Sequence, residues 1–82
     1  MRKFIFSDGA ATLLFENECI ILESDGWIVL EKYVPSDYAD VVPNVVRLIE
    51  KLEERDLPIT KVAKMVSAHI DRQLERIALS WL

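Results

Sequence analysis

The amino-acid sequence predicts one α+β domain over residues 1–82. A four-stranded antiparallel meander at 1–34 is expected to precede an antiparallel helical hairpin at 41–82, packed on one sheet face. Three observations favour this class. The triplet Ser-Asp-Gly occurs twice between apolar runs, the apolar spacing changes from alternating to helical after Pro35, and Pro58 divides the helical part in two.

Both Ser-Asp-Gly triplets are interpreted as turns rather than as binding sites. Asp-Gly between apolar runs is the strongest short-range hairpin signal, because glycine adopts positive φ without steric cost. A two-residue loop also fixes strand register. With turns at Asp8-Gly9, Glu16-Asn17 and Asp25-Gly26, the expected pairs include Phe4 with Leu13, Leu13 with Ile20, and Val29 with Leu22.

This register sorts the strand residues onto two faces, since successive side chains alternate sides. The second face carries an apolar patch of its own, although an antiparallel sheet usually exposes one face to water. The predicted core face comprises Phe4, Phe6, Ala11, Leu13, Phe15, Ile20, Leu22, Trp27, Val29 and Tyr33, interrupted by Glu18 and Glu31. The predicted second-face patch comprises Ile5, Leu14, Ile21, Ile28 and Leu30.

Two helices are expected after Pro35. The first is placed at about 41–55, with Asp37 or Asp40 as its N-cap. The second is expected to follow an N-cap at Thr60 and to run to the chain end, about two turns beyond the first. Its final turns are apolar, which suggests docking on the sheet or on another chain. The second apolar stripe comprises Val62, Val66, Ile70, Leu74, Ile77 and Trp81.

Catalytic chemistry is not expected from this composition. His69 is the only histidine and Cys19 the only cysteine, so neither a familiar zinc site nor an acid–base pair can be assembled. His69 is interpreted as a boundary residue and Cys19 as a small packing residue. The acidic residues are interpreted as a solvated surface, and no phosphate-binding loop occurs. The protein is therefore expected not to be an enzyme and to need no cofactor or metal.

The net charge of −4 is unevenly distributed. Residues 1–45 carry three basic and eight acidic residues, a balance of 3 − 8 = −5, which disfavours nucleic-acid binding by that half. A single cysteine and the lack of a long apolar run favour a soluble, cytoplasmic protein with no membrane partner.

The predicted function is that of a small non-catalytic protein-interaction module that forms a homodimer. Surplus apolar surface for so short a chain motivates this prediction. One alternative is a dimeric DNA-binding regulator that uses the second helix, with Lys61 and Lys64 at its start. Another is an acidic inhibitor or DNA mimic of mobile-element type that acts through Glu23, Asp25 and Glu31. The predicted interface comprises Ile5, Leu14, Ile21, Ile28, Leu30, Ile77, Trp81 and Leu82.

Overall fold

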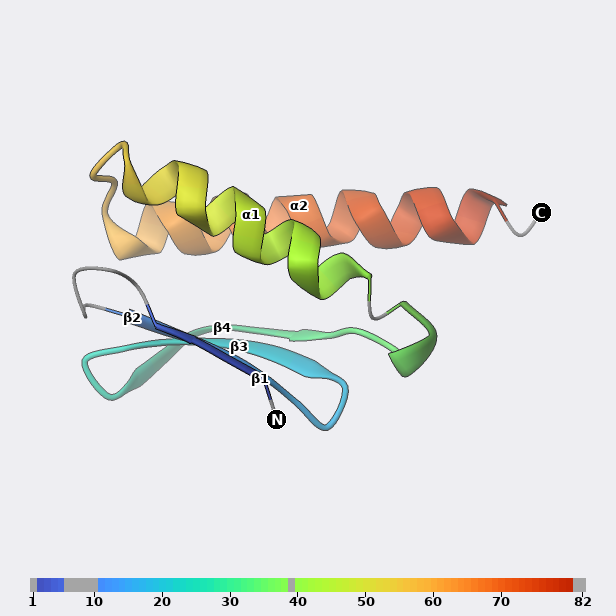
Figure 1. Cartoon of the computed structure of the whole chain (residues 1–82), viewed down its shortest axis with the longest axis horizontal. Helices are drawn as coiled ribbons and strands as arrows, with labels where there is room; N and C mark the ends of the chain where they lie inside the picture. Colours follow the sequence, from blue (N-terminus) through green and yellow to red (C-terminus); the bar gives the residue numbers. More distant parts are fainter. Residues whose placement is uncertain (1, 6–10, 39, 81–82) are drawn as a thin grey trace.

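The computed structural model describes residues 2–5, 11–38 and 40–80. It confirms the α+β class, because the chain forms an antiparallel sheet and two helices (Figure 1). Short turns join β2 to β3 and β3 to β4, and a single turn of 3-10 helix, η1, leads into the first helix. The elements are β1 (Arg2–Ile5), β2 (Ala11–Glu16), β3 (Cys19–Ser24), β4 (Trp27–Tyr33), η1 (Ser36–Tyr38), α1 (Val41–Glu53) and α2 (Ile59–Ser80).

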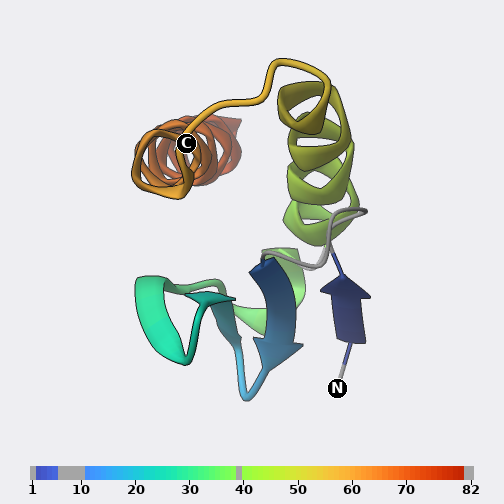
Figure 2. The same ribbon diagram turned by 90° about the vertical axis from the view of Figure 1, so that its left-hand side faces the viewer.

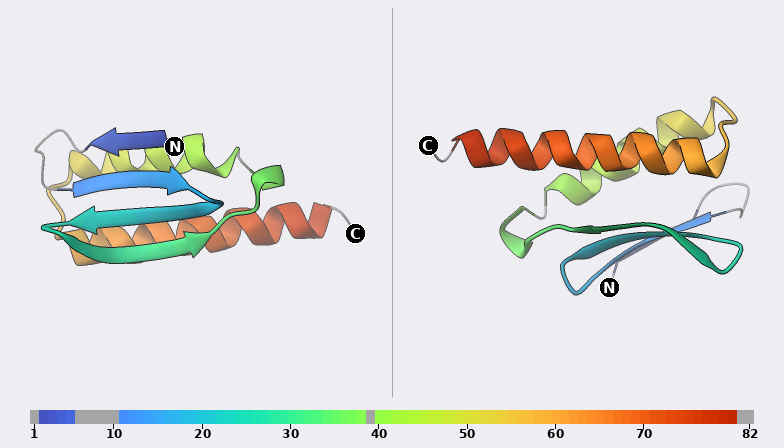
Figure 3. Two further views of the ribbon diagram at one scale, coloured as in Figure 1. Left: turned by 90° about the horizontal axis from the view of Figure 1, so that it is seen from below. Right: turned by 180° about the vertical axis from the view of Figure 1, so that it is seen from behind.

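The molecule has two layers. The strands follow one another across the sheet in the order β1-β2-β3-β4, so that β1 and β4 form its edges. Both helices cover the same face of the sheet, with α1 above the β1 side and α2 above the β4 side (Figures 2 and 3). On the opposite face, here called the outer face, the described residues form no further layer. Among the described residues, no helix is long and apolar enough to cross a membrane.

The core between the layers is apolar throughout the described part of the chain. Leu22 of β3, Ile49 of α1 and Ile70 of α2 are all fully buried, so the sheet and both helices contribute to one continuous cluster. No polar or charged residue among those described is buried. The hydrophobic effect is therefore the main force that holds the helices on the sheet. The buried residues are Ala11, Leu13, Ile20, Leu22, Val34, Val41, Val42, Val45, Ile49, Leu52, Val62, Ala63, Val66 and Ile70.

The first and last hairpins keep the predicted register near their turns. Phe4 lies opposite Leu13, as a two-residue loop at Asp8-Gly9 requires, although that loop and Phe6 lie outside the described residues. In the last hairpin Asp25 and Gly26 have φ values of 53° and 80°, which confirms a turn with both central residues at positive φ.

The predicted middle turn is wrong by one residue. Asn17 and Glu18 form the turn, with φ values of 52° and 61°, so that Leu13 lies opposite Leu22 instead of Ile20. The pairing therefore shifts by two positions, and an even shift leaves every side chain on its predicted face. Asparagine tolerates positive φ well, which favours Asn17 as the first central residue.

A β-bulge in β4 overturns part of the predicted core face. The register shifts between Leu22 and Glu23, because Val29 is inserted between the pairs Glu23–Ile28 and Leu22–Leu30. Beyond the bulge every side chain changes sides. Leu30 therefore faces the helices, whereas Glu31 and Tyr33 lie on the outer face, opposite Ile21 and Cys19 respectively.

Trp27 is also misplaced by the sequence prediction. Its side chain remains 75% exposed although it pairs with Ser24 on the helix side of the sheet. The β3–β4 turn bends away from the helices (Figure 1). The Trp27 side chain therefore stays largely open to solvent.

The helix boundaries differ modestly from those predicted. α1 ends at Glu53 rather than near 55, and Asp40 precedes it without a side-chain capping hydrogen bond. Thr60 lies inside α2 instead of capping it, because the Pro58 carbonyl accepts hydrogen bonds from the Lys61 and Val62 amides. α2 spans about 33 Å at 1.5 Å per residue and accounts for most of the longest dimension, 41 Å.

Candidate functional site

The strand register arranges the residue positions of the outer face in rows across the strands. Paired residues of neighbouring strands lie on the same side of the sheet, so the register defines its rows. The middle row places Leu14 and Ile21 at the centre of the face, on the two inner strands. The first row reads Ile5, Thr12, Glu23, Ile28; the second reads Lys3, Leu14, Ile21, Glu31; and the third reads Glu16, Cys19, Tyr33.

Large apolar side chains of this face are open to solvent. Ile5 is 59% exposed and Ile28 is 56% exposed, at opposite ends of the first row. Leu14 and Ile21 are half-buried by their neighbours alone. The outer face thus brings together four of the residues predicted from the sequence to form an interface.

Two other predicted interface residues, Leu30 and Ile77, do not join this patch. Leu30 faces the helices because of the bulge and packs against the core, so its assignment to the second face is corrected. Ile77 also packs against the core from α2. Leu79 is 60% exposed on the end of α2 that extends beyond α1, while Trp81 and Leu82 lie outside the described residues.

One edge of the outer face carries a hydrogen bond between Tyr33 and the middle turn. The Tyr33 hydroxyl donates to Glu18 Oε2 over 2.9 Å, and the Val34 amide donates to the Glu18 carbonyl over 2.7 Å. The hydrogen bond to the Glu18 carboxylate, together with its negative charge, raises the pKa of Tyr33 above its ordinary value. Glu18 therefore ties the β2–β3 turn to the end of β4.

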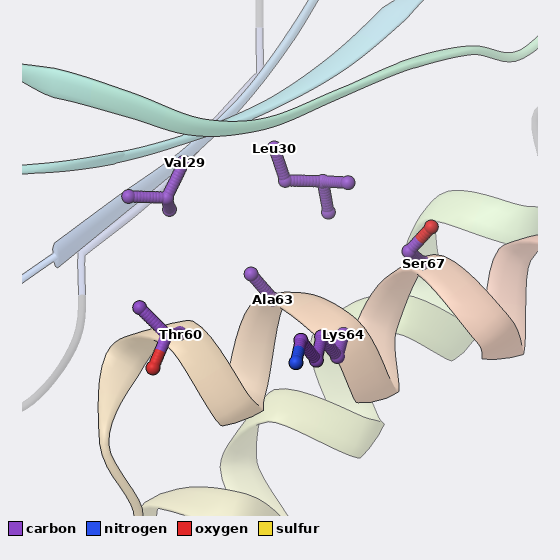
Figure 4. Close-up of a pocket in the computed structure, with 6 residues that line it drawn as sticks. All are labelled: Val29, Leu30, Thr60, Ala63, Lys64 and Ser67. Carbon is purple, nitrogen blue, oxygen red and sulfur yellow. The ribbon is translucent and has the colours of Figure 1, made fainter.

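An apolar groove, here called the edge groove, lies between β4 and α2. Val29 and Leu30 both point from the strand toward the helix, although consecutive strand residues normally point to opposite sides (Figure 4). The β-bulge explains this arrangement. The groove has a volume of about 430 Å³ and is lined by Val29, Leu30, Thr60, Ala63, Lys64 and Ser67.

A second groove, here called the helix groove, runs between α1 and α2 on the sides turned away from their buried stripes. It has a volume of about 430 Å³ and is mainly polar. Asn44 Nδ2 donates to Gln73 Oε1 over 3.1 Å and so joins the helices, while Arg47 Nη2 donates to Asn44 Oδ1. The groove is lined by Asn44, Arg47, Leu48, Lys51, His69, Gln73 and Arg76.

His69 forms part of the wall of the helix groove. Its Nε2 atom is occluded and has no hydrogen-bond partner among the described residues. Loss of solvation, and to a smaller extent the nearby Arg72 charge, lowers the pKa of His69 below its ordinary value. This environment favours the neutral imidazole, and partial exposure confirms the predicted boundary position of this residue.

The sequence prediction missed the helix groove. The signal was present in Arg47 and Lys51, which are four residues apart and lie off the apolar stripe of α1. Their partner in the groove, Arg76, comes from a helix whose basic residues alternate with acidic ones. Only the packing of the two helices brings these three charges to one place.

No group of metal-binding side chains forms in the described part of the chain. Cys19 is a free, partly exposed thiol on the outer face, next to Tyr33 rather than beside a histidine. No protein family matches this sequence, and the comparisons with curated proteins and with solved structures also found no significant match.

Proposed function

We propose that the protein is a small non-catalytic interaction module that forms a homodimer through the outer face of its sheet. The observation that carries this proposal is the pair of exposed isoleucines, Ile5 and Ile28, around the half-buried centre of Leu14 and Ile21. Exposed contiguous apolar surface commonly marks an interface, and two-fold pairing is its most frequent solution. The proposed interface extends across all four strands of the meander, from the β1 edge to the β4 edge.

A second copy of the chain fits the pattern of the rows. A two-fold axis parallel to the strands places β1 of one copy over β4 of the other. The two ends of each row then meet, so that Ile5 lies against Ile28 of the second copy and Leu14 against Ile21. The same operation sets the positive Lys3 position over the negative Glu31 position, and this charge complementarity favours the isologous pair.

The size of the face predicts a weak dimer. Four strands at about 4.8 Å spacing, each about six residues long at about 3.3 Å per residue, span an area of about 400 Å². Two such faces bury on the order of 800 Å², below the roughly 1,200 Å² at which standard stable interfaces begin. We therefore expect a dissociation constant in the micromolar range, so that monomer and dimer coexist at ordinary laboratory concentrations.

Sedimentation over a wide concentration range tests the proposal. We expect wild-type protein to change from monomer to dimer, and Ile21→Glu to remain a folded monomer, because the charge would be desolvated in the interface. Leu79→Glu is the matched control, since Leu79 is an exposed apolar residue outside the face. A wild-type monomer at every concentration would refute the dimer, and dissociation by Leu79→Glu alone would move the interface to the α2 end.

A charge exchange tests the orientation of the two copies. Glu31→Lys should weaken the dimer by opposing Lys3 of the second copy, and adding Lys3→Glu should restore it. If the double variant is as weak as the single one, the axis is not parallel to the strands. Retention of the fold is checked by circular dichroism in each case.

We do not extend the proposal to DNA binding by α2. The basic residues of that helix lie on different flanks, since Lys64 lines the edge groove whereas Arg76 lines the helix groove. A nucleic-acid-binding helix normally gathers its basic residues on one side. The acidic-inhibitor alternative would use Glu23 and Glu31, which lie in the same rows as Ile28 and Ile21, so it competes with the dimer for one surface.

A further inference from the structure

Positive charge gathers in the helix groove of a protein whose net charge is −4. Arg47 and Lys51 come from α1 and Arg76 from α2, and no carboxylate is among the residues that line the groove. Within the described residues, neither Lys51 nor Arg76 has a carboxylate at ion-pair distance. No acidic side chain of the groove lining therefore offsets its positive charge.

This arrangement costs stability unless an anion is present. Arg47 and Lys51 are four residues apart on one helix, a spacing at which like charges repel. Arg76 adds a third positive charge from the facing helix. A bound anion would relieve all three repulsions together, whereas substitution of any single cation relieves only part of them.

The groove is also partly organised for binding. The Asn44 carbonyl oxygen accepts from the Arg47 guanidinium, and the Asn44 amide donates to Gln73, so the arginine is held by an asparagine that is itself bonded to α2. Among the described residues, no acceptor is shown for the nitrogen of the Gln73 amide, which can therefore donate to a ligand. A side chain that is held in position before binding loses less conformational entropy when the ligand arrives.

The size and donor set indicate the class of ligand. A volume of about 430 Å³ falls within the range of small-molecule sites, roughly 300–1,000 Å³. Two guanidinium groups and one ammonium group suit a ligand with several anionic oxygens, because arginine donates two parallel hydrogen bonds to phosphate. We propose that the helix groove binds a small phosphate-bearing anion through Arg47, Lys51 and Arg76.

Titration with inorganic pyrophosphate at low ionic strength tests this proposal, with ¹H–¹⁵N spectra as the readout. We expect saturable shifts at Gln73 and at the His69 ring, and an increase in Kd of about tenfold or more in Arg47→Gln and Arg76→Gln. Lys61→Gln is the matched control, since Lys61 is an exposed cation of α2 outside the groove. Circular dichroism verifies that each variant is folded.

Two further probes distinguish the source of the phosphate. Equal affinity for pyrophosphate and ADP supports recognition of phosphate alone, and tighter binding of ADP supports a nucleotide ligand. An absence of saturation by both, or equal weakening in Lys61→Gln and Arg47→Gln, would overturn the site. Binding of duplex DNA without binding of either small anion would also overturn it.

This inference is independent of the dimer. The helix groove is lined by residues of α1 and α2. Both helices lie on the side of the sheet opposite to the outer face (Figure 2). Ile21→Glu should therefore bind pyrophosphate like the wild type. Failure of the dimer with retained pyrophosphate binding, or the reverse, identifies which of the two proposals is wrong.

Discussion

Lys32 Nζ of β4 lies 2.7 Å from Asp71 Oδ1 of α2, and this ion pair joins the sheet edge to the long helix. The pair exists because of the β-bulge. If the same sequence continued in regular pairing past Ile28, Glu31 would lie opposite Ile20 and point toward α2, where it would repel Asp71, and Lys32 would lie on the outer face. The bulge therefore replaces a repulsion between strand and helix with an attraction.

The first prediction concerns the strength of this ion pair. Its side chains are 28% and 60% exposed, so water screens the interaction. A double-mutant cycle with Lys32→Met and Asp71→Asn should give a coupling free energy of about 0.2–1 kcal/mol, measured by urea unfolding. The coupling should decrease as salt is added. A coupling well above this range, unaffected by salt, would mean that the pair is more buried than the structure indicates.

The second prediction separates the two faces on either side of the bulge. Leu30→Ala should lower the free energy of unfolding by about 1–3 kcal/mol, because a half-buried leucine that packs against the core is truncated. Ile28→Ala, 56% exposed and two residues away, should change it by less than about 0.5 kcal/mol. Urea titration at a concentration where the protein is monomeric measures both. Equal losses would place both side chains on the same face.

The fold class and most of the core could be predicted from the sequence because they depend on periodicity. Leu13, Ile20 and Leu22 alternate with polar or less buried residues, and Val45, Ile49 and Leu52 recur at helical spacing. The bulge could not be predicted, since Trp27–Leu30 is a continuous apolar run. No residue in this run marks the position at which the side chains change sides of the sheet. The misassignment of Leu30, Glu31 and Tyr33 follows from that single cause.

Of the two candidate surfaces, the outer-face patch could be predicted from the sequence, whereas the helix groove could not. The outer-face patch of Ile5, Leu14, Ile21 and Ile28 follows from strand alternation, which operates within one hairpin at a time. The helix groove depends on how α1 packs against α2, and its charges are about 25–30 residues apart in the chain. Local patterns contain no information on such a contact, so this surface emerges only from the three-dimensional packing.

The third prediction concerns the strained middle turn. Glu18 has a φ of 61°, a left-handed conformation that costs a non-glycine residue about 1–2 kcal/mol. Glu18→Gly creates an Asn-Gly turn and should raise the free energy of unfolding by about 0.5–1 kcal/mol, after the greater entropy loss of glycine is subtracted. It should also lower the pKa of Tyr33 toward its ordinary value, since Glu18 raises it.

Glu18→Gln separates these two effects, because it keeps the side chain but removes the charge. This control should lower the Tyr33 pKa, followed by tyrosinate absorbance, without the gain in stability. A Tyr33 pKa that is unchanged in both variants would show that the hydroxyl does not bond the Glu18 carboxylate in solution.

The fourth prediction concerns pH. Burial lowers the pKa of His69 in the folded protein, so the unfolded chain binds more protons between that value and about 6.5. The contribution of neutral His69 to stability is therefore fully present above about pH 6.5 and is lost as pH falls through the folded pKa. The positive charge of Arg72 acts in the same direction as burial, since it also opposes protonation of the ring.

Urea unfolding of the wild type and of His69→Gln between about pH 5 and pH 8 measures this contribution, because the acidic side chains ordinarily titrate below that range. The free energy of unfolding of the wild type should rise with pH across this interval, and the variant should show a flatter curve. Saturation with pyrophosphate should reduce the wild-type slope, because a bound anion favours the charged imidazolium. A variant curve parallel to that of the wild type would assign the pH dependence to other groups and leave His69 without a role in it.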